Sequence, residues 1–405
     1  MRLACFAALL PLVSTWWTTE DVPMPKVYIY TIPETLLHRD YHMDYSSCHH
    51  YFYAIELALP TLLTASRFVQ TASTLHDAAQ ADYFLVPQYS TCYYHRCKVD
   101  HDPEVCRGKT AEYLTAILDH VEEEYPFWQR KQGRDHLFVF SWDWGVHVLG
   151  EKDESVARNR VASSIHLTLL GMAHKDHRQV FDPHKDISIP PLGEYRHVET
   201  LPRPAQRTIF AYFRGSITNE YEYSLGIRQR LLKYGKEDPA HYFIRTEHSA
   251  FYWHELINAR YALCPLGWSH WSPRLFDAIE AGAIPVIIAD EWDVAFNRTI
   301  VDFREFTVRV PQRDIGRLTE ILKAIPQAEE ERMRSRMKKV AHRFAYHPVP
   351  QKDDATESLM QILAKRPLPQ VENIVLDLGN ASDGEYTHSG EEHDEEDEDS
   401  LNDEL

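Results

Sequence analysis

The sequence contains no hydrophobic run long enough to cross a membrane. A spanning helix needs about 20 apolar residues, and the longest run, residues 3–13, is roughly half that length. Arg2 precedes this run and Ser14 follows it, an order typical of a secretory signal peptide. We therefore expect residues 1–19 to be a cleaved signal peptide, or else a short signal-anchor that extends through Trp17.

The sequence also lacks a basic cluster, which argues against nucleic acid as a partner. The net charge of −18 is unevenly distributed, because residues 367–405 contain 14 Asp and Glu and no Lys or Arg, leaving −4 for the rest. This tail has no apolar periodicity and is predicted to be disordered. Its end, Asn402-Asp403-Glu404-Leu405, resembles a KDEL-type retrieval signal, although an acidic tail could also end this way by chance.

Five cysteines remain once the signal peptide is removed, and a secretory compartment favours disulfides between them. They are Cys48, Cys92, Cys97, Cys106 and Cys264. Three of them share a polar stretch with His95, His101 and Asp102, but the spacing matches no standard zinc pattern, so disulfides are preferred to a metal site. Two N-x-S/T sequons, at Asn297 and Asn380, agree with a lumenal location.

The composition is that of a globular protein with two or three domains, since 44% of its 405 residues are hydrophobic. Aromatic residues make up 12%, including 9 Trp and 22 Tyr. This content suits a protein that stacks on sugar rings, and it also suits an aromatic-rich core.

Short apolar segments alternate with segments of helical periodicity, which predicts an α/β protein with parallel sheets. Strands are expected at residues 26–30, 81–86, 137–140, 187–189, 208–213, 262–264, 284–288 and 307–310. Helices are expected at residues 51–63, 113–125, 227–234, 252–259, 274–281, 314–325 and 329–344. A polar, Pro-rich stretch at 194–206 divides the set into two Rossmann-like lobes, 23–200 and 207–345, followed by a crossover segment at 346–366.

Residues 259–290 contain the clearest candidate for a binding site. A short strand leads into a loop with Gly267, and then Ser272, Pro273 and Gly282 occupy the N-cap, first and C′ positions expected of a helix. The free backbone N–H groups at such a helix start, together with the helix dipole, attract an anion such as a diphosphate.

Arg274, in the first turn, would add a forked set of charged donors, and Asp277 on the same face could accept hydrogen bonds from ribose hydroxyls. Arg214, at the end of the strand at 208–213, could bind the diphosphate from the other side. These are the parts of a nucleotide-sugar site. The alternatives are an ordinary capped helix with a surface ion pair, and a surface arginine at position 214.

Asp143 is a candidate general base, because a carboxylate between Trp142 and Trp144 tends to have a raised pKa. The alternative is a structural Asp that caps the next turn. A metal-dependent reaction would instead use the D-x-D letters at residues 100–102, but these fall in the Cys-rich stretch, which is expected to be a loop, rather than at a strand end.

The stretch YALCPLGWSHWSPRLFDAIEAGAIPVIIAD resembles the exostosin-like glycosyltransferases, especially the single-domain plant-type members. The segments KVYIYTIPETL, ADYFLVPQYS, WQRKQGRDHLFVFSWDWG, KDISIPP and RTIFAYFRGSI are similar to other family motifs, in the same order. The resemblance covers roughly residues 26–344.

This resemblance implies a GT-B fold with two Rossmann-like lobes facing an interlobe cleft, and an inverting, metal-independent transfer from a UDP-sugar without other cofactors. It places Ser272, Arg274 and Asp277 at the donor-site positions of the family. Arg214 takes the place of the "FRG" arginine, and Asp143 that of the "HDWG" aspartate. The acceptor would be a glycan or glycoprotein in the Golgi or endoplasmic reticulum lumen.

The chain departs from the family pattern at several positions. Trp142 replaces the His of "HDWG", Asp277 replaces Glu, Ala262 and Ala283 stand where Cys is frequent, and Ala295 replaces Pro. The Trp142 change leaves open a lectin or a partner subunit of another transferase, although the intact donor positions favour an active enzyme.

In the expected reaction, a base in the N-terminal lobe deprotonates an acceptor hydroxyl, which displaces UDP from the sugar. Asp143 is the first candidate for this base, followed by His136 and Glu247. Arg274, Arg214 and the helix N-terminus would neutralise the leaving diphosphate.

Overall fold

A computed structural model describes residues 23–366, apart from 152–153, 173–179, 194–197, 199, 222 and 298. The described residues belong to one compact unit, Met1–Pro369. The expected signal peptide, the acidic tail with its retrieval-like end, the sequon at Asn380 and part of the Pro-rich stretch lie outside the described residues. Within the described part of the chain, no helix has the length and apolar character needed to cross a membrane.

The N-terminal half contains a five-stranded parallel sheet whose strands follow one another in sequence order. They are β1 (Val27–Ile29), β2 (Tyr83–Leu85), β3 (His136–Phe140), β4 (Ile165–Thr168) and β5 (Ile187–Ser188). The three middle strands are buried along their whole length, which explains why they read as continuous apolar runs.

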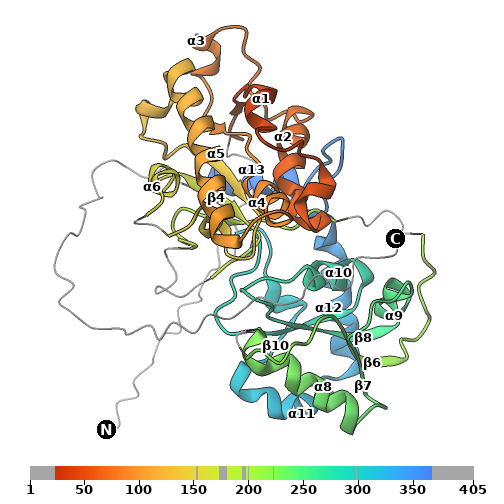
Figure 1. Ribbon diagram of the computed structural model, residues 1–405. Helices are drawn as coiled ribbons and strands as arrows, with labels where there is room; N and C mark the ends of the chain where they lie inside the picture. The colour runs from red at the N-terminus through yellow and green to blue at the C-terminus, as the bar shows by residue number, and fades with distance from the viewer. Residues whose placement is uncertain are drawn as a thin grey trace, which may run out of the picture. The chain divides into compact units, whose positions relative to one another are not determined.

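Six α-helices accompany this sheet in the described part of the chain (Figure 1). They are α1 (Glu34–Leu37), α2 (Ile55–Thr64), α3 (Leu75–Ala78), α4 (Ser90–Lys98), α5 (Pro103–Glu124) and α6 (Val156–Arg160). The Cys-rich stretch, expected to be a loop, is largely α4. Helix α5 begins at Pro103 rather than at 113, because Asp102 accepts a hydrogen bond from the N–H of Glu104 (2.8 Å) and caps it.

The C-terminal half contains a second parallel sheet, with strand order β10-β9-β8-β6-β7. Its strands are β6 (Ile209–Arg214), β7 (Tyr242–Arg245), β8 (Ala259–Pro265), β9 (Ile284–Ile288) and β10 (Val308–Arg309). The strand order reverses between β6 and β8, so the loops that follow these two strands flank a topological switch point. Ligands of open α/β sheets bind at such points.

Helices cover both faces of the second sheet: α8 lies on one face, while α9 and α10 lie on the other (Figure 1). Right-handed crossovers in opposite directions from the switch point produce this arrangement. The helices are α8 (Ile227–Glu237), α9 (Tyr252–Ile257), α10 (Pro273–Ala281), α11 (Leu318–Lys323) and α12 (Gln327–Val340).

The described chain ends in α13 (Ala355–Lys365), which returns to the first sheet. The hydroxyl of Tyr83 on β2 donates to the carbonyl of Leu363 (2.9 Å), and Arg366 donates to the carbonyl of Lys185 (2.8 Å). The last helix of the described chain therefore packs on the N-terminal half of the molecule.

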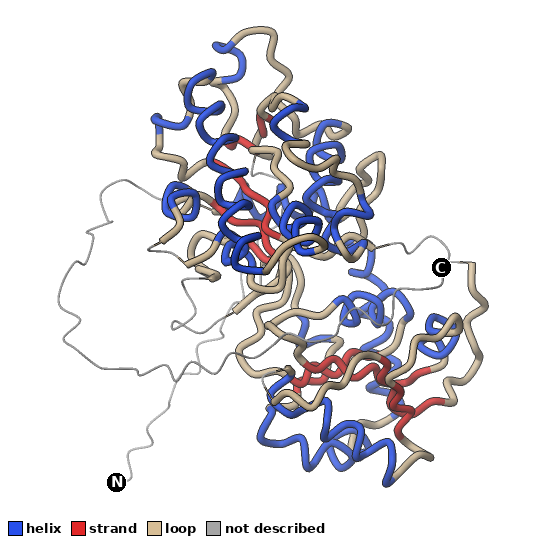
Figure 2. Tube along the Cα trace, in the orientation of Figure 1, coloured by secondary structure: helices blue, strands red, loops and turns tan. Residues whose placement is uncertain are grey.

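Two separate groups of strands are visible in Figure 2. The prediction of an α/β protein with two Rossmann-like sheets, the GT-B class, is confirmed. Disulfides were expected without a pairing, and the structure pairs Cys48 with Cys92 and Cys97 with Cys106, leaving Cys264 free and buried.

Candidate active site

The helix α10 starts at the switch point and leaves its first backbone N–H groups without a side-chain cap. Ser272 stands at the N-cap in an extended conformation (φ −163°, ψ 130°), as predicted, but its side chain accepts no backbone hydrogen bond from the helix. Its Oγ accepts instead from Nη1 of Arg274 (3.3 Å). The helix start is therefore open to an anion.

Arg274 is fixed across the switch point by main-chain oxygen. Its Nε and Nη2 both donate to the carbonyl of Arg214, at 3.1 and 2.7 Å, and its guanidinium lies 4.5 Å from the centre of the Phe213 ring. Gly215 permits this contact, because a Cβ there would collide with Nη2 of Arg274. The first-turn arginine of α10 is thus held against the end of β6.

A second arginine, Arg228, lies under the loop between β8 and α10. The sequence patterns did not identify it as a site residue. It is 5% exposed, and it donates from Nε to the carbonyl of Leu266 and from Nη1 to that of Ser216, both at 2.9 Å. Its guanidinium is 5.6 Å from the Phe213 ring, so two cations share that ring. Burial lowers the pKa of Arg228 to about 10.

Gly267 is placed where the loop passes over Arg228. A Cβ on Gly267 would stand 3.2 Å from Nη2 of Arg228, so a larger residue would crowd the guanidinium. The carbonyl of Gly267 accepts from the N–H of Ser224 (3.0 Å), which ties the loop to the segment before α8. That Gly267 helps to bind the donor remains a prediction. The closeness of Arg228 gives a steric reason for a glycine at this position.

Among the described residues, no carboxylate is hydrogen-bonded to Arg228 or Arg274, although Asp143 acts on the charge of Arg228 and Arg274 on that of Asp277. An anion that binds between the two guanidinium groups would therefore form charge-assisted hydrogen bonds without first breaking an ion pair. The two arginines have the same position in their elements. Each is the second residue of a helix that follows one of the two strands at the switch point.

Arg214 lies beside this pair, but the structure engages it differently from our expectation. Its Nε and Nη2 donate to the two carboxylate oxygens of Glu255, at 3.0 and 2.9 Å, and Nη1 donates to the carbonyl of Glu247. This bidentate pair neutralises the guanidinium. Arg214 contributes through its own carbonyl, which positions Arg274.

Asp277 lies one turn along α10 and accepts a hydrogen bond from the hydroxyl of Tyr252 (2.8 Å). Burial raises the pKa of Asp277 to about 6, although Arg274 acts in the opposite direction. The spacing suggested a surface ion pair as an alternative, but no ion pair between Asp277 and Arg274 is present. A partly buried carboxyl with a tyrosine partner can accept a hydroxyl donor.

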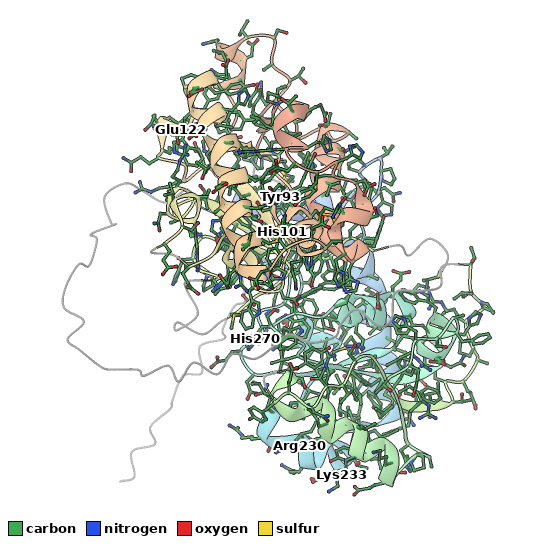
Figure 3. All side chains as sticks on the ribbon, viewed as in Figure 1. Tyr93, His101, Glu122, Arg230, Lys233 and His270 are labelled. Atoms are coloured by element: carbon green, nitrogen blue, oxygen red, sulfur yellow. A yellow bond between two sulfur atoms is a disulfide. The ribbon has the colours of Figure 1, made fainter. Side chains whose placement is uncertain are left out.

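Asp143 meets the loop between β8 and α10. Its Oδ1 accepts from the hydroxyl of Tyr53 (2.8 Å) and from Nε1 of Trp271 (2.6 Å). The same loop carries His270, labelled in Figure 3, whose carbonyl accepts from the N–H of Gly171 (3.2 Å). Two donors on one carboxylate oxygen hold Asp143 against Tyr53 and Trp271, and this geometry favours a positioning role.

The other candidate bases differ in access. His136 is fully buried, with Nε2 2.7 Å from the hydroxyl of Tyr30 and Nδ1 2.8 Å from Oδ1 of Asp135. The hydroxyl of an acceptor substrate cannot reach a fully buried imidazole, so the hypothesis that His136 is the base is wrong. Glu247 is exposed, and its carbonyl accepts from Arg214.

The D-x-D letters at residues 100–102 lie between α4 and α5, and their middle residue, His101, is labelled in Figure 3. Asp102 caps α5, and Asp100 accepts from Nη1 of Arg96 (3.1 Å), so both carboxylates have structural partners. In the part of the chain that the structure describes, no group of His, Cys, Asp or Glu side chains is arranged to hold a metal ion.

The exostosin GT47 domain model matches residues 22–325, three quarters of the chain. The chain belongs to the exostosin GT47 family. This confirms the resemblance and makes the chain a glycosyltransferase. It is 30% identical over 378 residues to "Probable glucuronosyltransferase Os01g0926400" of Oryza sativa subsp. japonica, covering 89% of this chain and 85% of that protein.

Two further proteins are similar to the chain. "Probable beta-1,4-xylosyltransferase IRX10L" of Arabidopsis thaliana is 30% identical over 319 residues, which is 76% of this chain and 73% of the relative. The crystal structure of Anabaena HepE in complex with UDP-glucose aligns with 84% of this chain and 99% of its own, at 8% identity and a TM-score of 0.39.

Proposed function

We propose that this glycosyltransferase takes its sugar from a UDP-sugar whose diphosphate binds between Arg274, Arg228 and the start of α10. The observation that carries the proposal is the pair of arginines over Phe213, neither of which forms an ion pair with a carboxylate among the described residues. Asp277 is positioned one turn further along the same helix to accept a ribose hydroxyl.

The reaction is an inverting displacement at the anomeric carbon by a hydroxyl of a glycan or glycoprotein. The two guanidinium groups and the N–H groups of α10 stabilise the charge that develops on the leaving diphosphate, so the arrangement requires no metal ion. Such donors are fixed before the reaction by the carbonyls of Arg214 and Leu266, and they need no reorganisation as the charge develops.

The sugar is a uronic acid or a pentose, in keeping with relatives named glucuronosyltransferase and xylosyltransferase. The enzyme works in the lumen of the Golgi or endoplasmic reticulum. Two disulfides support an oxidising compartment, and the retrieval-like C-terminus would bind a retrieval receptor there.

The test is thermal shift and UDP release with the protein from residue 20 onward, across a panel that includes UDP-glucuronic acid and UDP-xylose, with and without chelator. We expect one donor to stabilise the protein and to release UDP in chelator. Arg274→Gln should lower kcat/KM by about 100-fold, which is the cost of losing one charged donor to the leaving group.

The matched control is Arg313→Gln, because Arg313 is 85% exposed in a turn outside the site. Circular dichroism establishes that the Arg274 variant is folded. If the control loses as much activity as Arg274→Gln, the donor site is wrongly placed. If the wild-type protein binds a donor without releasing UDP, the chain is a lectin or a partner subunit instead.

A further inference from the structure

A cluster of histidines lies next to the donor loop, on the segment that connects Cys48 to α2. The disulfide Cys48–Cys92 ties this segment to α4, and His49 follows with a left-handed backbone (φ 64°) that is uncommon for a residue other than glycine. The His49 ring stacks on that of His95 of α4, with centroids 5.0 Å apart. Such backbone strain is concentrated at functional sites.

His50, the next residue, has an exposed imidazole. Its ring contacts those of His49 (centroids 4.1 Å apart), Phe52 (4.7 Å) and Tyr53 (5.9 Å). Within the described chain, neither ring nitrogen of His50 forms a hydrogen bond. The side chain is therefore held by ring packing while both of its nitrogens are free to meet a ligand.

Two routes connect His50 to the donor site. On one side, Phe52 and Tyr53 pack on Trp271, with centroids 5.2 and 5.9 Å apart, and Trp271 directly precedes Ser272 at the start of α10. On the other side lies His248, which is close enough to influence the charge of His50. His248 follows Glu247, whose carbonyl accepts a hydrogen bond from Arg214, in the segment after β7.

The surroundings keep His50 neutral in the absence of donor. The imidazole of His50 is exposed on one side, but the rings packed around it remove part of its hydration. This desolvation, together with repulsion from His49 and His248, lowers the pKa of His50 to about 4. Burial also lowers the pKa of His95, behind His49, well below its usual value, and the nearby Asp143 accepts a hydrogen bond from Tyr53. A bound diphosphate brings negative charge to this environment and would raise the pKa again, so the imidazole becomes a stronger base when the donor is present.

We propose that His50 is the general base that removes the proton from the acceptor hydroxyl. This inference rests on the proposed function. The hydroxyl proton moves to a ring nitrogen of His50 as the acceptor oxygen forms its bond to the anomeric carbon. The bond from that carbon to the diphosphate oxygen breaks, and UDP leaves with the electron pair. The imidazolium then gives its proton to water. Asp143 and Tyr53 act as positioning residues, because Tyr53 packs on His50 and on Trp271, and Asp143 accepts hydrogen bonds from both Tyr53 and Trp271.

The experiment compares full-length wild-type enzyme with His50→Gln, His50→Ala and the control His42→Gln. His42 is an exposed histidine that precedes Cys48 and stacks on His38. We expect His50→Gln to lower kcat by 100-fold or more, as loss of a general base does, while donor-induced thermal stabilisation is retained. Added imidazole should restore activity to His50→Ala, and His42→Gln should behave as wild type.

The pH profile provides a second readout. In the wild type, activity should fall on the acid side as the base becomes protonated, and this limb should lie at higher pH for kcat than for kcat/KM, since only kcat reports the donor complex. The limb should be absent from His50→Gln. Wild-type activity retained in His50→Gln overturns this inference alone. A wild-type protein without turnover on any donor overturns the proposed function, and this inference with it.

Discussion

At the scale of single residues, the ring of Phe213 is central, because it lies beside the guanidinium groups of both Arg228 and Arg274. Each arginine is anchored by main-chain carbonyls, which orient a guanidinium without cancelling its charge. Arg214, only one residue from Phe213, has the opposite arrangement, since Glu255 neutralises it. Arg228 and Arg274, whose partners are carbonyls, can therefore bind an anion. Arg214, whose partner is a carboxylate, supports them instead.

Gly215 offers a test of this anchoring. In Gly215→Ala the new Cβ would displace the guanidinium of Arg274 from the carbonyl of Arg214. We expect the donor dissociation constant to rise about tenfold, the effect of one weakened charged hydrogen bond, measured by calorimetry. Gly316→Ala is the control, because its Cβ would have no neighbour within 4 Å. Equal donor affinity in both variants would show that Arg274 does not bind the diphosphate.

At the scale of elements, α13 is notable because it lies at the end of the described chain yet packs on the first sheet. Leu359, Met360, Ile362 and Leu363 are each at most 3% exposed. Burial of side chains of this size stabilises a fold by about 1.5–3 kcal/mol each, so α13 contributes an amount comparable with the whole stability of a domain.

We therefore expect a chain ending at residue 350 to be unfolded or insoluble, whereas a chain ending at residue 366 keeps the fold. Circular dichroism and size-exclusion chromatography of the two proteins make the comparison. The longer protein is the control for truncation itself, since it lacks only residues 367–405. A soluble, cooperatively folding short protein would mean that α13 is dispensable.

The elements also show what the sequence can predict. The strand at 284–288 and the helix at 274–281 agree with β9 and, to within one residue, with α10, because buried β-branched runs and the Ser-Pro…Gly punctuation are local signals. Helix α4 was missed because its residues are mostly polar and its burial comes from disulfides and aromatic packing. Strand β7 has only four residues and depends on pairing with β6.

In the site, too, the residues with local sequence signals could be predicted and those that depend on tertiary contacts were missed. Arg274 and Gly267 could be predicted because they belong to the loop and helix of one continuous segment. Arg228 and His50 were missed, because they meet Leu266 and the rings near Trp271 from other elements through tertiary contacts. For Arg228 the position at the start of a helix was a local signal, but its pairing with the loop after β8 was not. The paired carboxylate that occupies Arg214 is likewise 41 residues away along the chain.

At the scale of the whole molecule, buried ionisable groups of both kinds link stability to pH. Burial raises the pKa of Glu56 to about 7, even though Thr91 and Ser141 donate hydrogen bonds to its carboxylate. Burial lowers the pKa of His166 to about 4, with Lys185 acting in the same direction. Each group prefers its neutral form in the folded state.

The two effects oppose each other. The folded pKa of Glu56 lies above its unfolded value of 4.5, so its contribution to the free energy of unfolding falls as the pH rises from 4.5 to 7. The folded pKa of His166 lies below its unfolded value of 6.5, so its contribution rises as the pH rises from 4 to 6.5. The wild-type protein therefore has a partly compensated pH dependence across this range.

Replacing Glu56 by Gln should remove the part of the free energy of unfolding that falls with rising pH, so that only the rising contribution of His166 remains. We expect the free energy of unfolding of Glu56→Gln to rise more steeply than that of the wild type between pH 4.5 and 7, by about 3 kcal/mol over the range. Urea unfolding at a series of pH values measures this slope, which is independent of any constant loss from the altered hydrogen bonds to Thr91 and Ser141. Glu112→Gln, at an exposed position of α5, should run parallel to the wild type. Parallel curves for Glu56→Gln as well would mean that Glu56 is ionised in the folded protein throughout this range, with its hydrogen bonds outweighing the effect of burial.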